Sequence, residues 1–132
     1  MSSALFVCVA NSCRSQMAEA MAKSLAGPEW EIWSAGSSPG GRVHPVAIQL
    51  MAELNLDLAA HRSKGLDEVP ERTWDIVVTM GCGDHCPFVR AHRRIDWAIP
   101  DPVGLSLEEA RKIRDGIRER VQDLLHQNRA QA

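Results

Sequence analysis

The residues best suited to chemistry lie together near the N-terminus, between Cys8 and Ser15. An apolar run ends at Cys8 and a stretch with helical spacing begins at Gln16, which predicts a strand, a loop and a helix in succession. In this arrangement the loop amides and the positive end of the helix dipole face one point and can bind an anion. These groups favour the thiolate form of Cys8, and the planar guanidinium of Arg14 suits two oxygens of a tetrahedral oxyanion. We therefore expect Cys8 to be a nucleophile and Arg14 to bind its substrate.

The residues between Cys8 and Arg14 complete this candidate anion site. Backbone amides that can donate to the oxyanion are those of Val9, Ala10, Asn11, Ser12 and Cys13. The hydroxyl of Ser15 can cap the following helix or donate to the sulfur of Cys8. A cysteine and an arginine at this spacing also occur by chance, as a buried thiol and a surface cation. The strand before them and the helix after them favour the anion loop.

A carboxyl group that can assist loss of an oxygen from the oxyanion is Asp101, in the pair Asp101-Pro102. The apolar neighbours Trp97, Ile99 and Val103 are expected to shield this carboxyl from water and so to keep it protonated. Asp-Pro is also a common turn, and an isolated example only redirects the chain.

A second pair of thiols, Cys82 and Cys86, follows the apolar run 74–80. With His85 these thiols offer three metal ligands, but a tetrahedral zinc site needs a fourth. The chain has no second C-x2-C pair, and Cys8 already belongs to the anion loop, so we expect neither a metal nor a cofactor. A chain of this size does not need disulfides to fold, and in a reducing compartment its cysteines are expected to do chemistry.

Strands and helices are predicted to alternate along the chain. The expected strands are residues 4–8, 30–34, 74–80 and 94–99, and the expected helices are residues 16–26, 44–54 and 106–127, with a turn of helix near the end of 57–68. This alternation predicts an α/β fold: one domain over residues 1–132, a three-layer sandwich whose four-stranded parallel sheet carries helices on both faces. Ligands bind beyond the C-terminal ends of such strands, so Cys8, Cys82 and Asp101 are expected to line one crevice.

Composition narrows the class of protein. With 132 residues, 45% of them hydrophobic, the chain can bury one core but not two. A net charge of −2 gives no basic field for nucleic acid. The apolar stretch 4–10 is too short for a signal peptide or a membrane span, so we expect a cytoplasmic protein that does not bind membranes, and a monomer.

The sequence from Cys8 to Ser15 resembles the C-x5-R-S signature of the low-molecular-weight protein tyrosine phosphatase fold. The run from Asn11 to Glu19 is similar to that of the thioredoxin-coupled arsenate reductases built on this fold. This resemblance implies that Cys8 forms a thiol adduct with arsenate and that Cys82 attacks the Cys8 sulfur, expelling arsenite. It further implies that Cys86 resolves the resulting disulfide and presents a new one to thioredoxin, and that Asp101 is the general acid.

The cysteine spacing departs from that pattern. The interval between Cys82 and Cys86 is shorter than in the well-known thioredoxin-coupled members and resembles a subgroup with a shorter redox loop. Glutaredoxin with glutathione, or mycothiol, are therefore alternative reductants. Cys13 is either a spectator or a site of damaging oxidation.

The resemblance also points to residues that support the loop. Some relatives bind a potassium ion with ligands matching Asn11, Glu19 and Ser34, and with a carboxylate where this chain has Lys64. An ammonium group at Lys64 can stand in for the ion by neutralising Glu19. Alternatively, Lys64 is exposed and supports nothing.

Three functions follow from these patterns. The leading one is reduction of arsenate to arsenite for arsenic detoxification, with phosphate as a competing anion and weak phosphatase activity as a side reaction. The alternative is a low-molecular-weight protein tyrosine phosphatase that acts through a Cys8 phosphoenzyme. The chain contains no tyrosine, whereas phosphatases of this fold present tyrosines after the Asp-Pro pair to stack on the substrate. A non-catalytic oxyanion-binding module would have no use for Cys82 and Cys86.

Overall fold

The computed structural model describes residues 2–58, 61–81 and 89–130. Its elements, in chain order, are β1 (Ser2–Cys8), α1 (Arg14–Leu25), β2 (Trp30–Gly36), α2 (Pro45–Ala52), the 3-10 helix η1 (Leu66–Glu68), β3 (Trp74–Thr79), β4 (Ala91–Asp96) and α3 (Leu107–Ala130). Within the described residues, no helix combines the length and the apolar character needed to cross a membrane.

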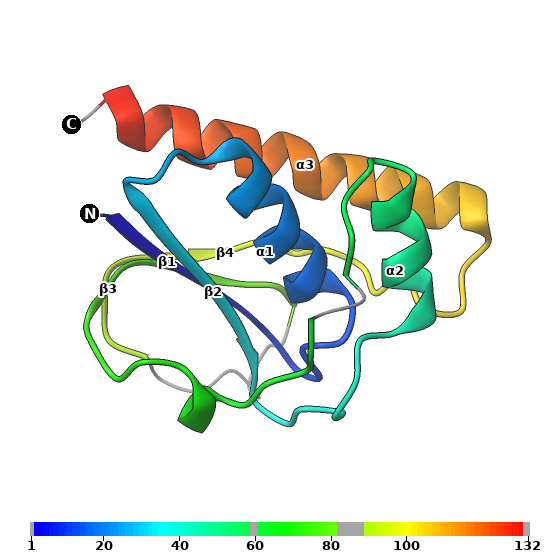
Figure 1. The fold of residues 1–132 in the computed structure, drawn as a ribbon, viewed down its shortest axis with the longest axis horizontal. Coiled ribbons are helices and arrows are strands. Elements are labelled where there is room, and N and C mark those ends of the chain that lie inside the picture. The colour runs from blue at the N-terminus through cyan, green and yellow to red at the C-terminus, as the bar shows by residue number, and fades with distance from the viewer. Residues whose placement is uncertain (1, 59–60, 82–88, 131–132) are drawn as a thin grey trace.

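The four strands form one parallel sheet, as predicted, and their order is β2-β1-β3-β4 (Figure 1). Cys8, the last residue of β1, pairs with Gly36 at the end of β2, and Val7 pairs with Thr79 at the end of β3. The C-terminal ends of the three strands are therefore aligned at one edge of the sheet, where α/β folds bind ligands.

One face of the sheet packs against all three α-helices. Because side chains alternate along a strand, Ala4, Phe6 and Cys8 of β1 face this side and are buried there. α3 lies across this layer (Figure 1). The buried apolar residues described in α3, spaced at helical intervals, are Ala110, Ile117, Val121, Leu124 and Leu125.

The other face carries a smaller apolar cluster, in which Leu5, Val7 and Trp74 are buried. Leu66 of η1 and Val69 pack against this cluster, so helical structure lies on both faces of the sheet. In the described residues, however, the second layer contains a 3-10 turn and extended chain instead of an α-helix. η1 confirms the turn of helix predicted near the end of 57–68.

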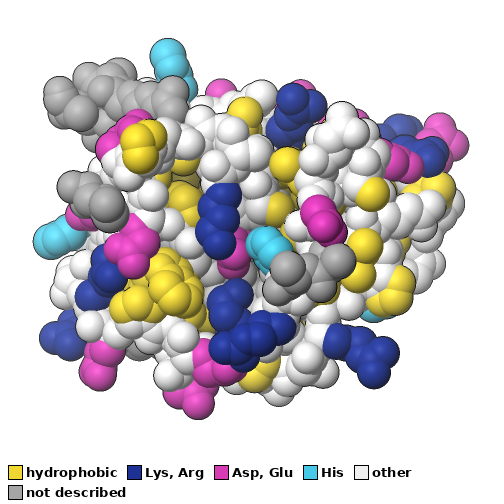
Figure 2. Space-filling view, viewed as in Figure 1, with side chains coloured by type: hydrophobic (Ala, Val, Ile, Leu, Met, Phe, Trp, Pro, Cys, Tyr) yellow, Lys and Arg dark blue, Asp and Glu magenta, His cyan; other side chains and the backbone are white. Residues whose placement is uncertain are grey.

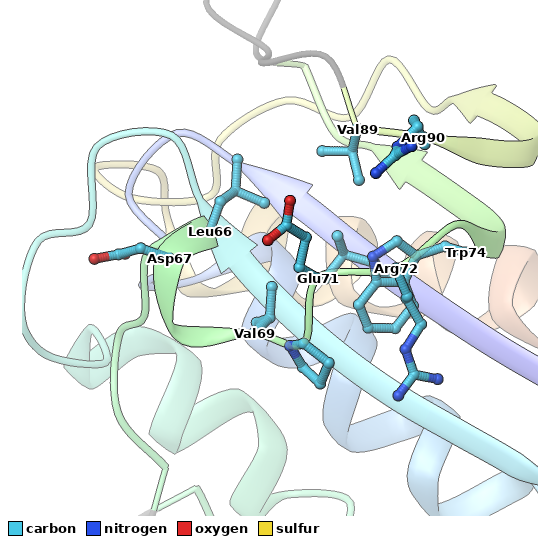
Figure 3. Close-up of a pocket in the computed structure, with 10 residues that line it drawn as sticks. Leu66, Asp67, Val69, Glu71, Arg72, Trp74, Val89 and Arg90 are labelled. Atoms are coloured by element: carbon cyan, nitrogen blue, oxygen red, sulfur yellow. The ribbon is translucent and has the colours of Figure 1, made fainter.

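A hollow of about 600 Å³ opens on this second face. Leu66, Val69 and Val89 surround it, and Trp74 lies against it (Figure 3). None of the residues lining the hollow belongs to the loop from Cys8 to Ser15, which lies at the sheet edge.

The prediction for the fourth strand is wrong by three residues, because β4 spans Ala91–Asp96 instead of 94–99. β4 is an edge strand, and an edge strand can hold consecutive polar residues such as Arg93 and Arg94. Trp97 follows the strand and is buried because its ring packs on Phe6, with 5.9 Å between ring centroids. The predicted strand continued through Trp97 because its apolar side chain fitted the alternation of a strand, whereas its burial comes from this tertiary contact.

Candidate functional site

The loop between β1 and α1 is held in place by the chain that follows β2. Four of its carbonyl oxygens accept backbone hydrogen bonds, at 2.8–3.2 Å, from residues 37–44; the accepting residues are Cys8, Val9, Ala10 and Ser12. In a trans peptide the N–H points opposite to the carbonyl. The amides of Val9, Ala10, Asn11 and Cys13 therefore point to the other side, away from residues 37–44. Amides that point to one side are what the predicted anion-binding surface requires.

Asn11 adopts the left-handed conformation, with φ of 50°, which an asparagine tolerates better than most residues. Its buried side chain makes four hydrogen bonds. Nδ2 donates to Ser15 Oγ at 2.7 Å and to Ser34 Oγ at 3.0 Å. Oδ1 accepts from Gln16 Nε2 at 2.9 Å and from the Lys64 amide at 2.8 Å. The strained turn is thus fixed by β2, α1 and the segment 61–65.

The sulfur of Cys8 lies 2.8 Å from the hydroxyl oxygen of Ser15, and both residues are buried. Asn11 donates to Ser15 Oγ and holds it beside the sulfur. When Cys8 is ionised it has no hydrogen, so the Ser15 hydroxyl is then the donor. A hydroxyl that donates to sulfur stabilises a thiolate. The geometry therefore suits the nucleophile predicted at Cys8.

Cys13 has a different environment. Burial, together with the charges of Asp101 and Cys8, raises the pKa of its thiol to about 12, and Arg14 only partly compensates. Cys13 therefore stays protonated at neutral pH and is a poor nucleophile. Of its two predicted roles, this environment favours the spectator.

Arg14 connects the loop to the ends of the other strands. Its Nη1 donates to the Ile99 carbonyl at 3.0 Å. A Cβ at Gly81, directly after β3 and Met80, would lie only 2.8 Å from the same nitrogen. The guanidinium thus lies between the residue preceding Cys82 and the segment leading to Asp101. Cys82, His85 and Cys86 themselves lie outside the described residues.

The surroundings of Asp101 differ from the expectation. Trp97 and Ile99 are buried, but Asp101 is exposed and its Oδ1 accepts from the Val103 amide at 3.0 Å. Trp97 and Ile99 turn into the core, and the third apolar neighbour, Val103, is exposed, so none of them shields the carboxyl from water. Its charge nevertheless acts on Cys13, beside the nucleophile.

The four predicted loop-supporting residues meet in one buried cluster. Glu19 accepts from the Ser34 hydroxyl and lies 3.3 Å from Lys64 Nζ, and Lys64 Nζ lies 3.4 Å from Ser34 Oγ. Only 12% of the Lys64 side chain is exposed, which argues against the alternative of an idle surface lysine. Asn11 joins the cluster through Ser34 and the Lys64 amide.

The ionisation of Glu19 reflects this cluster. Burial raises the pKa of its carboxyl, but hydrogen bonds from Lys23 and Ser34 and the charge of Lys64 outweigh burial, so the pKa is lowered. A hollow of about 500 Å³ opens above it, and basic side chains and a histidine gather on this side of the molecule (Figure 2).

Sequence reasoning missed three residues that hold the loop. Gln16 is fully buried, and its Nε2 donates to the Asn11 carbonyl at 3.2 Å. His61 Nδ1 lies 3.1 Å from Gln16 Oε1. Ser63 donates to the Ala10 carbonyl at 2.7 Å. No sequence signal links residues 61–63 to a loop about fifty residues earlier.

The structure offers no metal site among the residues it describes, since no three of their His, Cys, Asp and Glu side chains form a group that could hold an ion. The zinc alternative concerned Cys82, His85 and Cys86, which are outside those ranges.

Comparison with known proteins agrees with this architecture. Residues 3–132 match the family of low molecular weight phosphotyrosine protein phosphatases. "Arsenate reductase 2" of Staphylococcus saprophyticus is 38% identical over 120 residues, covering 88% of this chain and 90% of that protein. "Glutaredoxin arsenate reductase" of Synechocystis is 38% identical over 128 residues, covering 95% and 97%.

A solved structure described as an arsenate reductase in the phosphate binding state superposes with a TM-score of 0.87, at 38% identity, over 96% of this chain and 98% of the other. Because the family model and these relatives match nearly its whole length, the chain belongs to the low molecular weight phosphotyrosine protein phosphatase family.

Proposed function

We propose that this protein is an enzyme that reduces arsenate to arsenite. The observation that carries the proposal is the Cys8 sulfur beside the Ser15 hydroxyl, at the start of a loop whose amides point to one side. Relatives named arsenate reductases, which match this chain over at least 90% of their own length, support the proposal. The loop fits a small tetrahedral oxyanion, and a relative described as binding phosphate supports phosphate as a competitor.

The chemistry begins at Cys8. Its thiolate attacks the arsenic atom of arsenate and forms an S–As bond, while one oxygen leaves as water, with Asp101 as the proposed proton donor. Arg14 and the amides of residues 9–13 hold the remaining oxygens. This step is a substitution, so no electrons have been transferred and the arsenic is still in the oxidation state of arsenate.

The redox step needs two further thiols. The Cys82 thiolate attacks the Cys8 sulfur; the S–As bond breaks and its electron pair stays on arsenic, which leaves as arsenite. Cys86 then attacks Cys82, which frees Cys8 and leaves a Cys82–Cys86 disulfide. An external thiol reductant returns the two electrons, from one dithiol or from two monothiol molecules. The roles of both cysteines rest on resemblance to relatives.

The identity of the external reductant belongs to the same proposal. Resemblance to the thioredoxin-coupled enzymes supports thioredoxin, and the name of the Synechocystis relative supports glutaredoxin. Glutathione and mycothiol are further thiols of the right chemistry. All of these act in a reducing compartment, so we place the protein in the cytoplasm.

Lys64 is proposed to replace the potassium ion of some relatives. Its ammonium lies 3.3 Å from Glu19 and 3.4 Å from Ser34, so a positive charge already neutralises the carboxylate. We therefore expect an enzyme that does not need potassium.

The decisive test counts free thiols on fully reduced protein before and after a small excess of arsenate, with phosphate as the control anion. Arsenate alone should consume two thiols, and Cys82→Ser should abolish this loss. If arsenate consumes none, the thiol relay is wrong. Hydrolysis of phosphate esters at a rate that exceeds arsenate reduction would then favour the tyrosine phosphatase. The sequence argues against that alternative, because it has no tyrosine to stack on an aromatic substrate.

A further inference from the structure

One peptide of the anion loop is held by a different kind of partner from its neighbours. The carbonyls of Cys8, Val9, Ala10 and Ser12 are held by backbone amides of residues 37–44. The Asn11 carbonyl instead accepts from a side chain, Nε2 of Gln16, at 3.2 Å. The N–H opposite this carbonyl belongs to Ser12. Its direction therefore depends on Gln16.

We propose that Gln16 is a positioning residue that turns the Ser12 amide toward the bound oxyanion, and that His61 fixes the orientation of the Gln16 amide. The inference rests on one part of the proposed function, which is that the loop binds an oxyanion, and it does not require arsenate reduction.

The contacts of Gln16 leave one orientation for its amide group. Nε2 lies close to three oxygens that can only accept: Asn11 O at 3.2 Å, Asn11 Oδ1 at 2.9 Å and Arg62 O at 2.8 Å. A flipped amide would place Oε1 against three acceptors, which is repulsive. The nitrogen must therefore face the loop.

The oxygen of the same amide faces His61, whose Nδ1 lies 3.1 Å from Gln16 Oε1. Because Oε1 can only accept, the hydrogen must be on Nδ1. Gln16 is fully buried, so losing this donor would leave its oxygen without a partner and allow the amide to reorient.

The donor, and not the charge, of His61 is what the proposal requires. Burial lowers the pKa of His61; Lys23 and Lys64 lower it as well, while Glu19 and Asp57 raise it. The ring is therefore neutral near pH 7. Nδ1 carries a hydrogen both in the neutral tautomer that donates to Gln16 and in the protonated form.

A pair of substitutions at His61 separates donor from bulk. In His61→Asn, the side-chain amide nitrogen can take the place of Nδ1 and donate to Gln16. In His61→Leu, no donor remains. The readout is the affinity for inorganic phosphate, measured as protection of Cys8 from alkylation by iodoacetamide and located by mass spectrometry. We expect His61→Leu to weaken phosphate binding about tenfold and His61→Asn to stay within twofold of the wild type.

Gln16→Met tests the same contact directly. It keeps a similar volume but removes both hydrogen-bonding groups, and we expect phosphate affinity to fall at least tenfold. Gln122→Met, on the exposed side of α3, is the matched control and should leave the affinity unchanged. The thermal midpoint of each variant reports folding.

Two results would overturn the inference: a folded Gln16→Met protein with wild-type phosphate affinity, or equal affinities in His61→Leu and His61→Asn. If Gln16→Met does not fold, the His61 pair decides alone. Arsenate-dependent thiol loss is measured on the same wild-type protein. Its absence with phosphate binding intact would refute the proposed reduction and leave the role of Gln16 standing.

Discussion

The hydroxyl oxygen of Ser15 lies 2.8 Å from the sulfur of Cys8, and Nδ2 of Asn11 donates to that same oxygen at 2.7 Å. The second contact holds the Ser15 oxygen beside the sulfur. A thiolate has no hydrogen, so the hydroxyl is the donor to the ionised sulfur and stabilises its negative charge. The left-handed turn at Asn11 therefore contributes to the reactivity of Cys8 as well as to the shape of the loop.

Replacing Ser15 with alanine should slow the reaction of Cys8. Hydrogen bonds to charged groups contribute about 1.5–3 kcal/mol, so alkylation of Cys8 at pH 7 and arsenate reduction should both fall roughly 10- to 100-fold. Ser24→Ala is the control, since the Ser24 hydroxyl donates to the Met21 carbonyl within α1, away from Cys8. Unchanged alkylation in Ser15→Ala would show that the hydroxyl does not act on the thiolate.

Gly81 and Gly104 provide a matched pair for the contact with Arg14. Both glycines have positive φ, 79° and 87°, so alanine at either should cost about 1–2 kcal/mol in backbone strain. Only at Gly81 would the new Cβ meet the Arg14 guanidinium; at Gly104 no atom lies within 4 Å. We expect Gly81→Ala to weaken phosphate binding about tenfold or more and Gly104→Ala to leave it unchanged. Equal effects would assign the loss to backbone strain alone.

The sequence predicted best those features that depend on neighbouring residues. Cys8 ends β1, and Arg14 and Ser15 begin α1. A strand, a short loop and a helix in succession therefore bring these side chains close together. β3 was also predictable, because burial on both faces makes its sequence almost continuously apolar.

Contacts between distant segments could not be predicted in this way. Gln16 and His61 look like ordinary surface residues, yet Gln16 is fully buried and contacts His61 and Arg62. Asp101 is the opposite case: its apolar neighbour Ile99 turns into the core while the carboxyl stays exposed. The approach of Lys64 to Glu19 followed from resemblance to relatives and not from any local pattern.

Acidification should destabilise the protein through Glu19. Its pKa is lowered in the folded state, so the folded protein binds its proton less readily than the unfolded chain does. The stabilisation is therefore present above the unfolded value of 4.5 and is lost as the pH falls through the lower folded value. Urea denaturation between pH 7 and pH 3 should show a smaller loss of stability in Glu19→Gln than in the wild type.

The control for this comparison is Glu119→Gln, an exposed carboxylate on α3. It should keep the wild-type dependence on pH. If Glu19→Gln loses stability on acidification as steeply as the wild type does, other carboxylates must account for the effect.

Exchanging Lys64 for aspartate should create a requirement for potassium. In the wild type, the Lys64 ammonium lies within 3.3 Å of Glu19, and potassium chloride should shift the thermal midpoint no more than sodium chloride at equal concentration. Lys64→Asp removes that charge and gathers two carboxylates with the oxygens of Asn11 and Ser34. A cation at ten times its Kd would then stabilise the fold by about 1.4 kcal/mol, a rise of roughly 4 °C in the midpoint. Lys64→Met separates the two effects, because it removes the ammonium without adding a ligand and should respond equally to both salts. A potassium-specific rise in the wild type would mean that Lys64 does not take the place of the ion.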